Sequence, residues 1–358
     1  MKRNSYADYL KGILMLTVLA AHTWAALSQG LQATPASIPL LYVMGPWHMP
    51  LFMAVAGWFF ADSVRKRSFE ELAGNKSRTI LVPLVLWTIL YQLCLQILDA
   101  AGAPTDTLSA GSLWFLYSLL LCSLLMALCY HAGRKTRPAV EYTLALALAA
   151  WLSTTSAAAF HVAYMFPFFL CGYTCARLRV RPLPGWASCI ILASTVLFYV
   201  FAEMNGHAKG WSVWQSGTWI FGPQGWRRHL FLDCYRIFLG LAGSIGFAGV
   251  MYSLQQLFKS RKWNERLTWC PVCIGWVKEL GKWSLTVYAA QSVVVELLFR
   301  CGVSFLYIHN GGNPFAEHLI LLRWIVVPLT TLALAAAVMA LVRKLQGSCW
   351  ISRALTGK

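Results

Sequence analysis

The sequence is poor in charged residues, and acidic residues are the scarcest, with 13 Asp and Glu against 30 Lys and Arg in 358 residues. Only 12% of the residues are charged while 58% are hydrophobic, and the mean hydropathy is +0.57. This composition excludes an ordinary soluble protein and is typical of a protein that crosses a membrane many times. No connecting segment is long enough for a soluble domain, so residues 1–358 are expected to form a single membrane domain.

The sequence also lacks the patterns of nucleic-acid and metal sites. Its formal charge is +17, but the cations stand in short segments between apolar stretches and form no basic groove interleaved with aromatic residues. Such placement is typical of cations that fix membrane topology, so no nucleic-acid partner is expected. Cys270 and Cys273 form a close pair without a second pair at zinc spacing, so no metal is expected. The first apolar stretch lacks a clean small-x-small cleavage site, so it is expected to be an uncleaved span.

Ten apolar stretches follow one another, most of them near the about 17 to 25 residues that cross a bilayer as a helix. They comprise residues 9–27, 42–61, 79–98, 112–130, 140–152, 157–176, 185–201, 235–254, 281–300 and 317–341. Ser and Thr residues divide the fifth stretch from the sixth, and Pro138 and Pro167 favour two helices there over one. The expected fold is all-α: a polytopic transmembrane bundle of about ten spans, with no internal repeat.

The segments between these stretches alternate between those rich in Lys and Arg and those nearly bare of them. The bare set contains Lys209, Arg227 and Arg228. The rich set contains Lys2, Arg3, Arg65, Lys66, Arg67, Lys76, Arg78, Arg134, Lys135, Arg137, Arg177, Arg179, Arg181, Lys259, Arg261, Lys262, Arg266, Lys278, Arg343, Lys344, Arg353 and Lys358. Because cytoplasmic loops carry the excess of Lys and Arg, both termini are expected in the cytoplasm.

The first apolar stretch carries a cation near its start and an imidazole near its end. Lys11 and His22 are eleven residues apart, which in an α-helix is about 16 Å and about three turns. Both side chains therefore point along one stripe, with Lys11 on the cytoplasmic side and His22 toward the outer side. Ionisable groups at such depth are costly and usually functional, and a neutral imidazole can take a proton from a hydroxyl. The structural alternative is that the Lys11 side chain extends to the membrane–water interface and that His22 forms its hydrogen bonds within the helix bundle.

A second group of cations, Lys76 and Arg78, stands just before the third apolar stretch. Together with Lys11, these residues offer positive charge to a phosphate-bearing donor on the cytoplasmic face. The alternative for each basic residue taken singly is that it only sets the membrane topology.

Further motifs accompany the pattern Asp8-Tyr9-Leu10-Lys11-Gly12 and His22. They are Trp47-His48-Met49-Pro50-Leu51-Phe52, Ala56-Gly57, Lys76-Ser77-Arg78, Leu113-Trp114-Phe115-Leu116, Pro167-Phe168-Phe169-Leu170-Cys171-Gly172-Tyr173 and Gly281-x-x-Ser284-Leu285-x-x-Tyr288. In order and spacing, over nearly the whole chain, they resemble the acyltransferase 3 family of integral-membrane acyltransferases. The chain departs from that family where Lys11 replaces the more usual Arg, which weakens a bidentate phosphate contact but keeps the charge. It also has Gln291 where a His is frequent.

This resemblance implies an enzyme that transfers an acyl group from a coenzyme A thioester to a sugar hydroxyl of an extracytoplasmic glycan. Lys11, Lys76 and Arg78 would bind the phosphates of the donor, acetyl-CoA, while Asp8 would fix Lys11 and His22 would act as the base. The chain length and the lack of a fused esterase-like domain resemble the fucose 4-O-acetylase-like and exopolysaccharide O-acetyltransferase members. That similarity implies a multi-pass protein of the bacterial inner (cytoplasmic) membrane, surrounded by lipid.

Four more residues are candidates for the site. Trp47, His48 and Trp114 are expected to line the binding site for the acceptor, a glycan or a lipid-linked oligosaccharide, although helix packing explains His48 as well. Glu296 is an acid inside the ninth stretch at a depth near His22, where it could orient the imidazole in catalysis. An ion pair of Glu296 with Arg300 or Arg236 is the structural alternative.

The sequence therefore predicts a membrane O-acyltransferase, in particular an O-acetyltransferase, that modifies an exported or surface polysaccharide or its lipid-linked precursor. The alternative from another class is a transporter or flippase for a lipid-linked glycan. Transporters tend to show repeated halves and helices interrupted near the midplane, and neither is evident here. A third hypothesis, a glycan-binding partner without activity, is disfavoured by the presence of His22.

Overall fold

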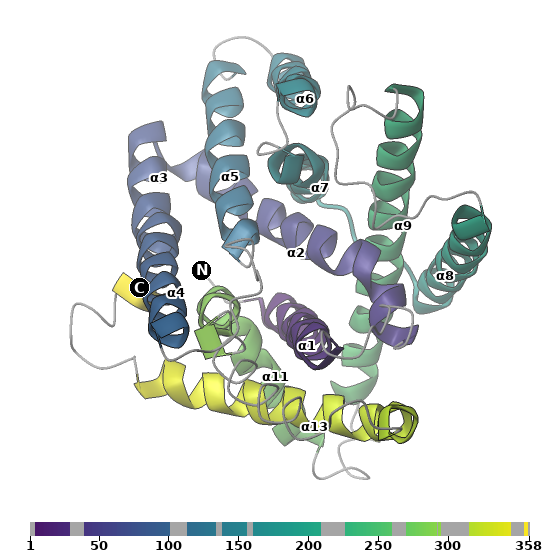
Figure 1. Cartoon of the computed structure of the whole chain (residues 1–358). Coiled ribbons are helices and arrows are strands. Elements are labelled where there is room, and N and C mark those ends of the chain that lie inside the picture. The colour runs from purple at the N-terminus through teal and green to yellow at the C-terminus, as the bar shows by residue number, and fades with distance from the viewer. Residues whose placement is uncertain are drawn as a thin grey trace. The chain divides into compact units, whose positions relative to one another are not determined.

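The computed structural model describes residues 4–28, 39–100, 113–133, 138–155, 160–208, 226–259, 270–291, 293–294, 315–344 and 354–356. Within these ranges the regular secondary structure is helical and contains no strand, which confirms the all-α class for this part of the chain. The helices, labelled in Figure 1, are α1 (Ser5–Ser28), α2 (Pro39–Lys66), α3 (Phe69–Lys76), η2 (Ser77–Leu81), α4 (Val82–Ala100), α5 (Trp114–Gly133), α6 (Pro138–Thr155), α7 (Phe160–Arg177), α8 (Gly185–Ala208), α9 (Trp226–Lys259), α11 (Cys270–Lys282) and α13 (Phe315–Lys344).

Four helical segments in the described ranges are long and apolar enough to cross a membrane. They are Phe69–Ile97, Trp114–Gly133, Gly185–Asn205 and Leu230–Phe258, and they coincide with the third, fourth, seventh and eighth predicted spans. On α8, the side chains of Leu197 and Phe201 are each 70% exposed, as expected for residues that face lipid. The chain is therefore an integral membrane protein, while the total of ten spans and the cytoplasmic location of both termini stay predictions.

The fifth and sixth apolar stretches form two helices, as predicted. They are α6 and α7, which pack against each other. Pro167 lies inside α7, and Pro46 and Pro50 lie inside α2, so these prolines do not end their helices. Membrane helices tolerate internal proline because neighbouring groups satisfy the backbone carbonyls that the proline leaves without a donor.

The helices group into two compact units. Unit 1 consists of residues 1–42, 77–116 and 273–358, and unit 2 consists of residues 43–76 and 117–272. The expectation of a single membrane domain over residues 1–358 stays a prediction.

Unit 1 is built around a backbone contact between α1 and α11. A Cβ atom added at Gly12 would lie 1.9 Å from the carbonyl oxygen of Val277, and one added at Gly281 would lie 1.8 Å from the carbonyl oxygen of Asp8. Only glycine at both positions allows the two helices to approach this closely, in the manner of small-residue contacts between membrane helices. Helix α13 also packs against α1.

The start of α1 is fixed by a capping residue. The side-chain oxygen of Asn4 accepts hydrogen bonds from the backbone N–H groups of Tyr6 (3.1 Å) and Ala7 (3.3 Å). Asn is among the preferred N-cap residues because its oxygen satisfies backbone donors that have no partner within the helix. This cap sets the beginning of the helix that carries Lys11 and His22.

Unit 2 repeats the glycine contact between other helices. A Cβ at Gly57 of α2 would lie 2.0 Å from the carbonyl oxygen of Phe169, and one at Gly172 of α7 would lie 1.8 Å from that of Ala54. Helices α8 and α9 lie side by side (Figure 1), and they also meet at a glycine, where a Cβ on Gly246 would lie 2.8 Å from the backbone nitrogen of Leu192. Gly57 and Gly172, which belong to two of the motifs that resemble the family, thus allow the backbones of α2 and α7 to pack closely.

Candidate active site

Helix α1 carries the two central site residues on one uninterrupted helix. It runs for 24 residues from Ser5 to Ser28 and includes both Lys11 and His22. The helix is regular, so the two positions are separated by about 16 Å along its axis and differ by about 20° around it. The predicted common stripe is therefore present in the backbone of α1.

Lys11 forms an ion pair within the first turns of the helix. Its ammonium nitrogen lies 3.3 Å from Oδ1 of Asp8, and the two side chains are 23% and 12% exposed. Positions i and i+3 are neighbours on a helix surface, so this pairing follows from the spacing. Asp8 and Lys11 are thus in direct contact, and their roles in binding a donor stay predictions.

The same turn of α1 is held by the contact with α11. Gly12 follows Lys11 directly and meets the backbone of α11 at Val277, while Gly281 meets the backbone carbonyl of Asp8. A contact made of backbone atoms on both sides cannot adjust as side chains do. It therefore fixes the height and direction from which the Lys11 side chain leaves the helix.

His22 lies in the C-terminal half of α1, and its side chain is half-buried. From Tyr6 to Thr23 every side chain of α1 is buried or half-buried, with Leu14, Met15 and Leu19 fully buried. Helix α1 is therefore an interior helix. The side chain of His22 is therefore less exposed than side chains of α8 such as Leu197 and Phe201.

The other predicted donor-binding cations differ in their surroundings. Lys76 is at the end of α3, and its ammonium nitrogen lies 5.6 Å from the centre of the Phe60 ring, an attractive cation–π distance. The positive charge of Arg67 acts on the same ammonium group. Arg78 is exposed and stands in the π-helical turn η2. Such turns are rare and often mark functional positions in helices.

His48 is oriented by its own helix. Its Nδ1 lies 3.1 Å from the carbonyl oxygen of Met44 and 3.0 Å from that of Gly45. Carbonyl oxygens only accept, so Nδ1 carries the proton and donates it. The neutral ring then has its lone pair on Nε2, which can accept a hydrogen bond from a hydroxyl.

Trp47, next to His48, is a packing residue in unit 2. It is 1% exposed, and a Cβ at Gly243 of α9 would lie 2.5 Å from its ring. Its carbonyl oxygen accepts a hydrogen bond from the Ser244 hydroxyl at 3.4 Å. Its indole nitrogen has no hydrogen-bond partner among the described residues. The packing of Trp47 is thus observed, and its contact with an acceptor sugar stays a prediction.

Of the remaining candidates, Trp114 begins α5 and is half-buried, with its ring 6.0 Å from that of Phe115 in an edge-on arrangement. Glu296 and Arg300 lie outside the described residues, so the predicted depth of Glu296 stays untested. The guanidinium of Arg236 lies 4.3 Å from the centre of the Tyr164 ring, which gives this arginine a described partner other than Glu296. Within the part of the chain that the structure describes, no group of three His, Cys, Asp or Glu residues could hold a metal ion.

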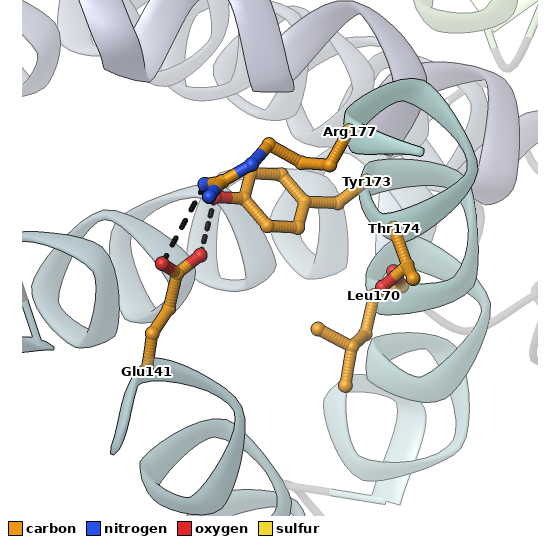
Figure 2. A network of polar contacts seen from close by, with 5 residues as sticks. All are labelled: Glu141, Leu170, Tyr173, Thr174 and Arg177. Carbon is orange, nitrogen blue, oxygen red and sulfur yellow. Dashed lines mark hydrogen bonds and ion pairs between the residues drawn. The ribbon is translucent and has the colours of Figure 1, made fainter. Parts of the chain in front are cut away.

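The sequence reasoning missed a buried polar network in unit 2 (Figure 2). Tyr173 donates a hydrogen bond to Oε1 of Glu141 and accepts one from Arg177 at 2.7 Å, while Arg177 and Glu141 form an ion pair at 3.6 Å. Glu141 is 3% exposed and comes from the first turn of α6, whereas Tyr173 and Arg177 lie one turn apart near the end of α7. An acid inside an apolar stretch is the signal that could have found it. The network ties α6 to α7.

Comparisons with known proteins identify the family of the chain. Residues 4–342 match the family model Acyl_transf_3, described as an acyltransferase domain. The match spans nearly the whole chain, so the protein belongs to the acyltransferase 3 family and is an enzyme that transfers acyl groups.

Two relatives are both named Nodulation protein NolL. That of Mesorhizobium japonicum is 24% identical over 322 residues, covering 83% of this chain and 78% of the relative. That of Sinorhizobium fredii is 25% identical over 182 residues, which is 49% of this chain and 49% of the relative. No solved structure matches the chain.

Proposed function

We propose that the protein is a membrane O-acyltransferase, in particular an O-acetyltransferase, that moves the acyl group of cytoplasmic acetyl-CoA to a sugar hydroxyl. The acceptor is an exported or surface polysaccharide or its lipid-linked precursor, and the location is the bacterial inner membrane. The observation that carries this proposal is the pairing of a fixed cation and an imidazole on α1, within a chain of the acyltransferase 3 family.

The donor end of the site is assigned to the cations near the cytoplasmic face. Lys11 binds a phosphate of the donor, and Asp8 at 3.3 Å sets the direction of its ammonium group. Arg78 is exposed and offers the planar, doubly donating guanidinium that suits a phosphate. Lys76 contributes a third positive charge beside the Phe60 ring. A donor that carries several phosphate groups can use more than one cation, which is the reason for assigning all three to it.

The reacting end of the site is assigned to His22. Its imidazole takes the proton of the acceptor hydroxyl while that oxygen attacks the thioester carbonyl carbon, and the carbonyl electron pair moves onto its oxygen. As the carbonyl re-forms, the carbon–sulfur bond breaks and the leaving thiolate receives the proton held by the imidazolium. Trp47, His48 and Trp114 are each assigned to the acceptor, with Nε2 of His48 accepting a hydrogen bond from a sugar hydroxyl. Glu296 orients the imidazole of His22.

Replacement of His22 tests this proposal. We expect cells that carry His22→Ala to lose ester-linked acyl groups on their exported glycan at normal levels of the protein. His131→Ala is the matched control, because this imidazole packs edge-on against Phe69 near the end of α5 and has no assigned role. Unchanged acylation in the His22→Ala cells would overturn the assignment. If glycan export were lost while acylation of the remaining glycan persisted, the transporter alternative would be supported instead.

A further inference from the structure

Two buried side chains of unit 1 donate hydrogen bonds to one short segment far along the chain. The indole N–H of Trp87 in α4 donates to the carbonyl oxygen of Leu355 at 3.1 Å. The hydroxyl of Thr286 donates to the carbonyl oxygen of Thr356 at 3.4 Å. Trp87 is 2% exposed and Thr286 is 5% exposed. Residues 354–356, a single helical turn drawn in yellow beside α4 in Figure 1, therefore supply the acceptors for two interior donors.

The hydrogen bond of Thr286 differs from those of other helical threonines in this protein. A threonine hydroxyl in a helix commonly donates to the carbonyl oxygen four residues earlier. Such bonds are made by Thr17, Thr88, Thr174 and Thr195. Thr286 lies in the helix of residues 284–291, but its hydroxyl donates to a different segment. This bond therefore joins two parts of the chain and is not a local feature of one helix.

Helix α11 runs toward the start of α1. Gly12 of α1 meets the backbone of Val277. Gly281 meets the backbone carbonyl of Asp8, so a step of four residues along α11 corresponds to a step of four residues back along α1. This end of α1 carries the ion pair of Asp8 with Lys11, to which the proposed function assigns a phosphate of the donor. The chain that follows Gly281 therefore begins beside the proposed donor end of the site.

Thr286 and its partner lie near this contact. The chain is helical again from residue 284, and Thr286 is five residues beyond Gly281. Five residues of helix rise about 7.5 Å. The hydroxyl of Thr286 contacts Thr356 directly. The turn of residues 354–356 is therefore held near the backbone contact of Gly281.

The turn is held less firmly than the groups that bind it. Residues 354–356 form only one turn, and their side chains are half-buried. One helical turn is not stable by itself, and a segment with few buried contacts opens at a low free energy. Trp87, in contrast, belongs to the helical segment Phe69–Ile97, which is long enough to cross a membrane. The turn can therefore leave its two hydrogen-bond donors without the unfolding of a membrane-spanning helix.

We propose that residues 354–356 are an autoinhibitory turn that, while bound to Trp87 and Thr286, obstructs the donor end of unit 1. Coenzyme A then binds only after the turn has left. This inference rests on the proposed function and adds a means of regulating it. The apparent affinity for coenzyme A is lowered in proportion to the fraction of protein in which the turn has left.

The expected effect has a sign that a purely structural contact would not give. Thr286→Val keeps the shape of the side chain and removes one hydrogen bond, which typically corresponds to about two- to tenfold in an equilibrium constant. It should therefore tighten the binding of coenzyme A by about that factor. Deletion of residues 354–358 removes both bonds and should tighten the binding by about tenfold or more. If the turn only stabilised the fold, both variants would bind coenzyme A no better than the wild type.

The experiment titrates coenzyme A into the purified full-length protein in detergent and measures the dissociation constant by calorimetry. Lys11→Ala reports whether the binding depends on the proposed donor site. Trp87→Phe removes the other hydrogen bond to the turn and should also tighten the binding. Thr88→Val is the matched control, because the hydroxyl of Thr88 donates to the carbonyl oxygen of Leu84 in its own helix at 2.7 Å. This control should leave the dissociation constant unchanged.

The outcomes separate this inference from the proposed function. If the wild type does not bind coenzyme A, or if Lys11→Ala binds it equally well, the donor assignment fails and the inference falls with it. If the binding depends on Lys11 and the deletion variant binds no more tightly than the wild type, the autoinhibitory turn alone is overturned. Should the deletion variant fail to fold, Thr286→Val decides: tighter binding supports the turn, and unchanged or weaker binding overturns it.

Discussion

The contact between α1 and α11 gives the sharpest prediction for a packing substitution. In Gly12→Ala the new methyl group would lie 1.9 Å from the carbonyl oxygen of Val277, short of ordinary contact at 3.4 Å by about 1.5 Å. Both sides of the contact are helix backbone, so the two helices must move apart rather than rotate a side chain. Overpacking of this kind costs about 1 to 3 kcal/mol. We expect a loss of unfolding free energy at the upper end of that range.

The same substitution should also affect the donor. Lys11 precedes Gly12 and pairs with Asp8, whose carbonyl oxygen is itself the contact of Gly281. Moving α1 away from α11 displaces the ammonium group, so KM for acetyl-CoA should rise in Gly12→Ala more than kcat falls. The assay combines the unfolding midpoint in detergent with kinetics of thiol release in vesicles.

The chain offers a matched control on the same helix. Nothing lies within 4 Å of a Cβ added at Gly275 of α11, so Gly275→Ala should be neutral or stabilising by up to about 1 kcal/mol through helix propensity. The double variant Gly12→Ala with Gly281→Ala should lose less stability than the two single losses combined, because separating the helices once relieves both clashes. Equal midpoints for Gly12→Ala and Gly275→Ala would refute the close contact.

Two other predictions concern Lys11 and the network in unit 2. Lys11→Ala should raise KM for acetyl-CoA more than Lys11→Arg does, because Arg keeps the charge and adds a second donor; wild-type kinetics for both variants would count against donor binding by Lys11. Tyr173→Phe removes the hydroxyl between Glu141 and Arg177 and leaves the buried Glu141 with one partner fewer. It should lower the unfolding free energy by about 1 to 3 kcal/mol, while KM for acetyl-CoA stays the same. An unaltered unfolding midpoint would show that the network does not join α6 to α7.

Much of the helical structure could be predicted from the sequence because hydrophobic length alone specifies a membrane helix. The third, fourth, seventh and eighth predicted spans correspond to helices long and apolar enough to cross a membrane. The Asp8–Lys11 pair was also predictable, because residues three apart share a helix face. In both cases the information lies within one helix.

Features formed between helices could not be predicted in the same way. Gly12 and Gly281 carry no local signal that they meet, and Glu141 finds Tyr173 only once α6 lies against α7. Trp87 likewise donates to a carbonyl oxygen 268 residues further along the chain. Contacts between distant parts of the chain require the packed structure.

The most direct test of the central claim uses inside-out membrane vesicles that hold the acceptor glycan within. Acetyl-CoA labelled in its acetyl group is added outside, at the original cytoplasmic face, and ester-linked label on the enclosed glycan is measured. We expect labelled ester with the wild type and none with His22→Ala, although this variant should still bind acetyl-CoA through Lys11. Equal labelling by the two proteins would contradict it.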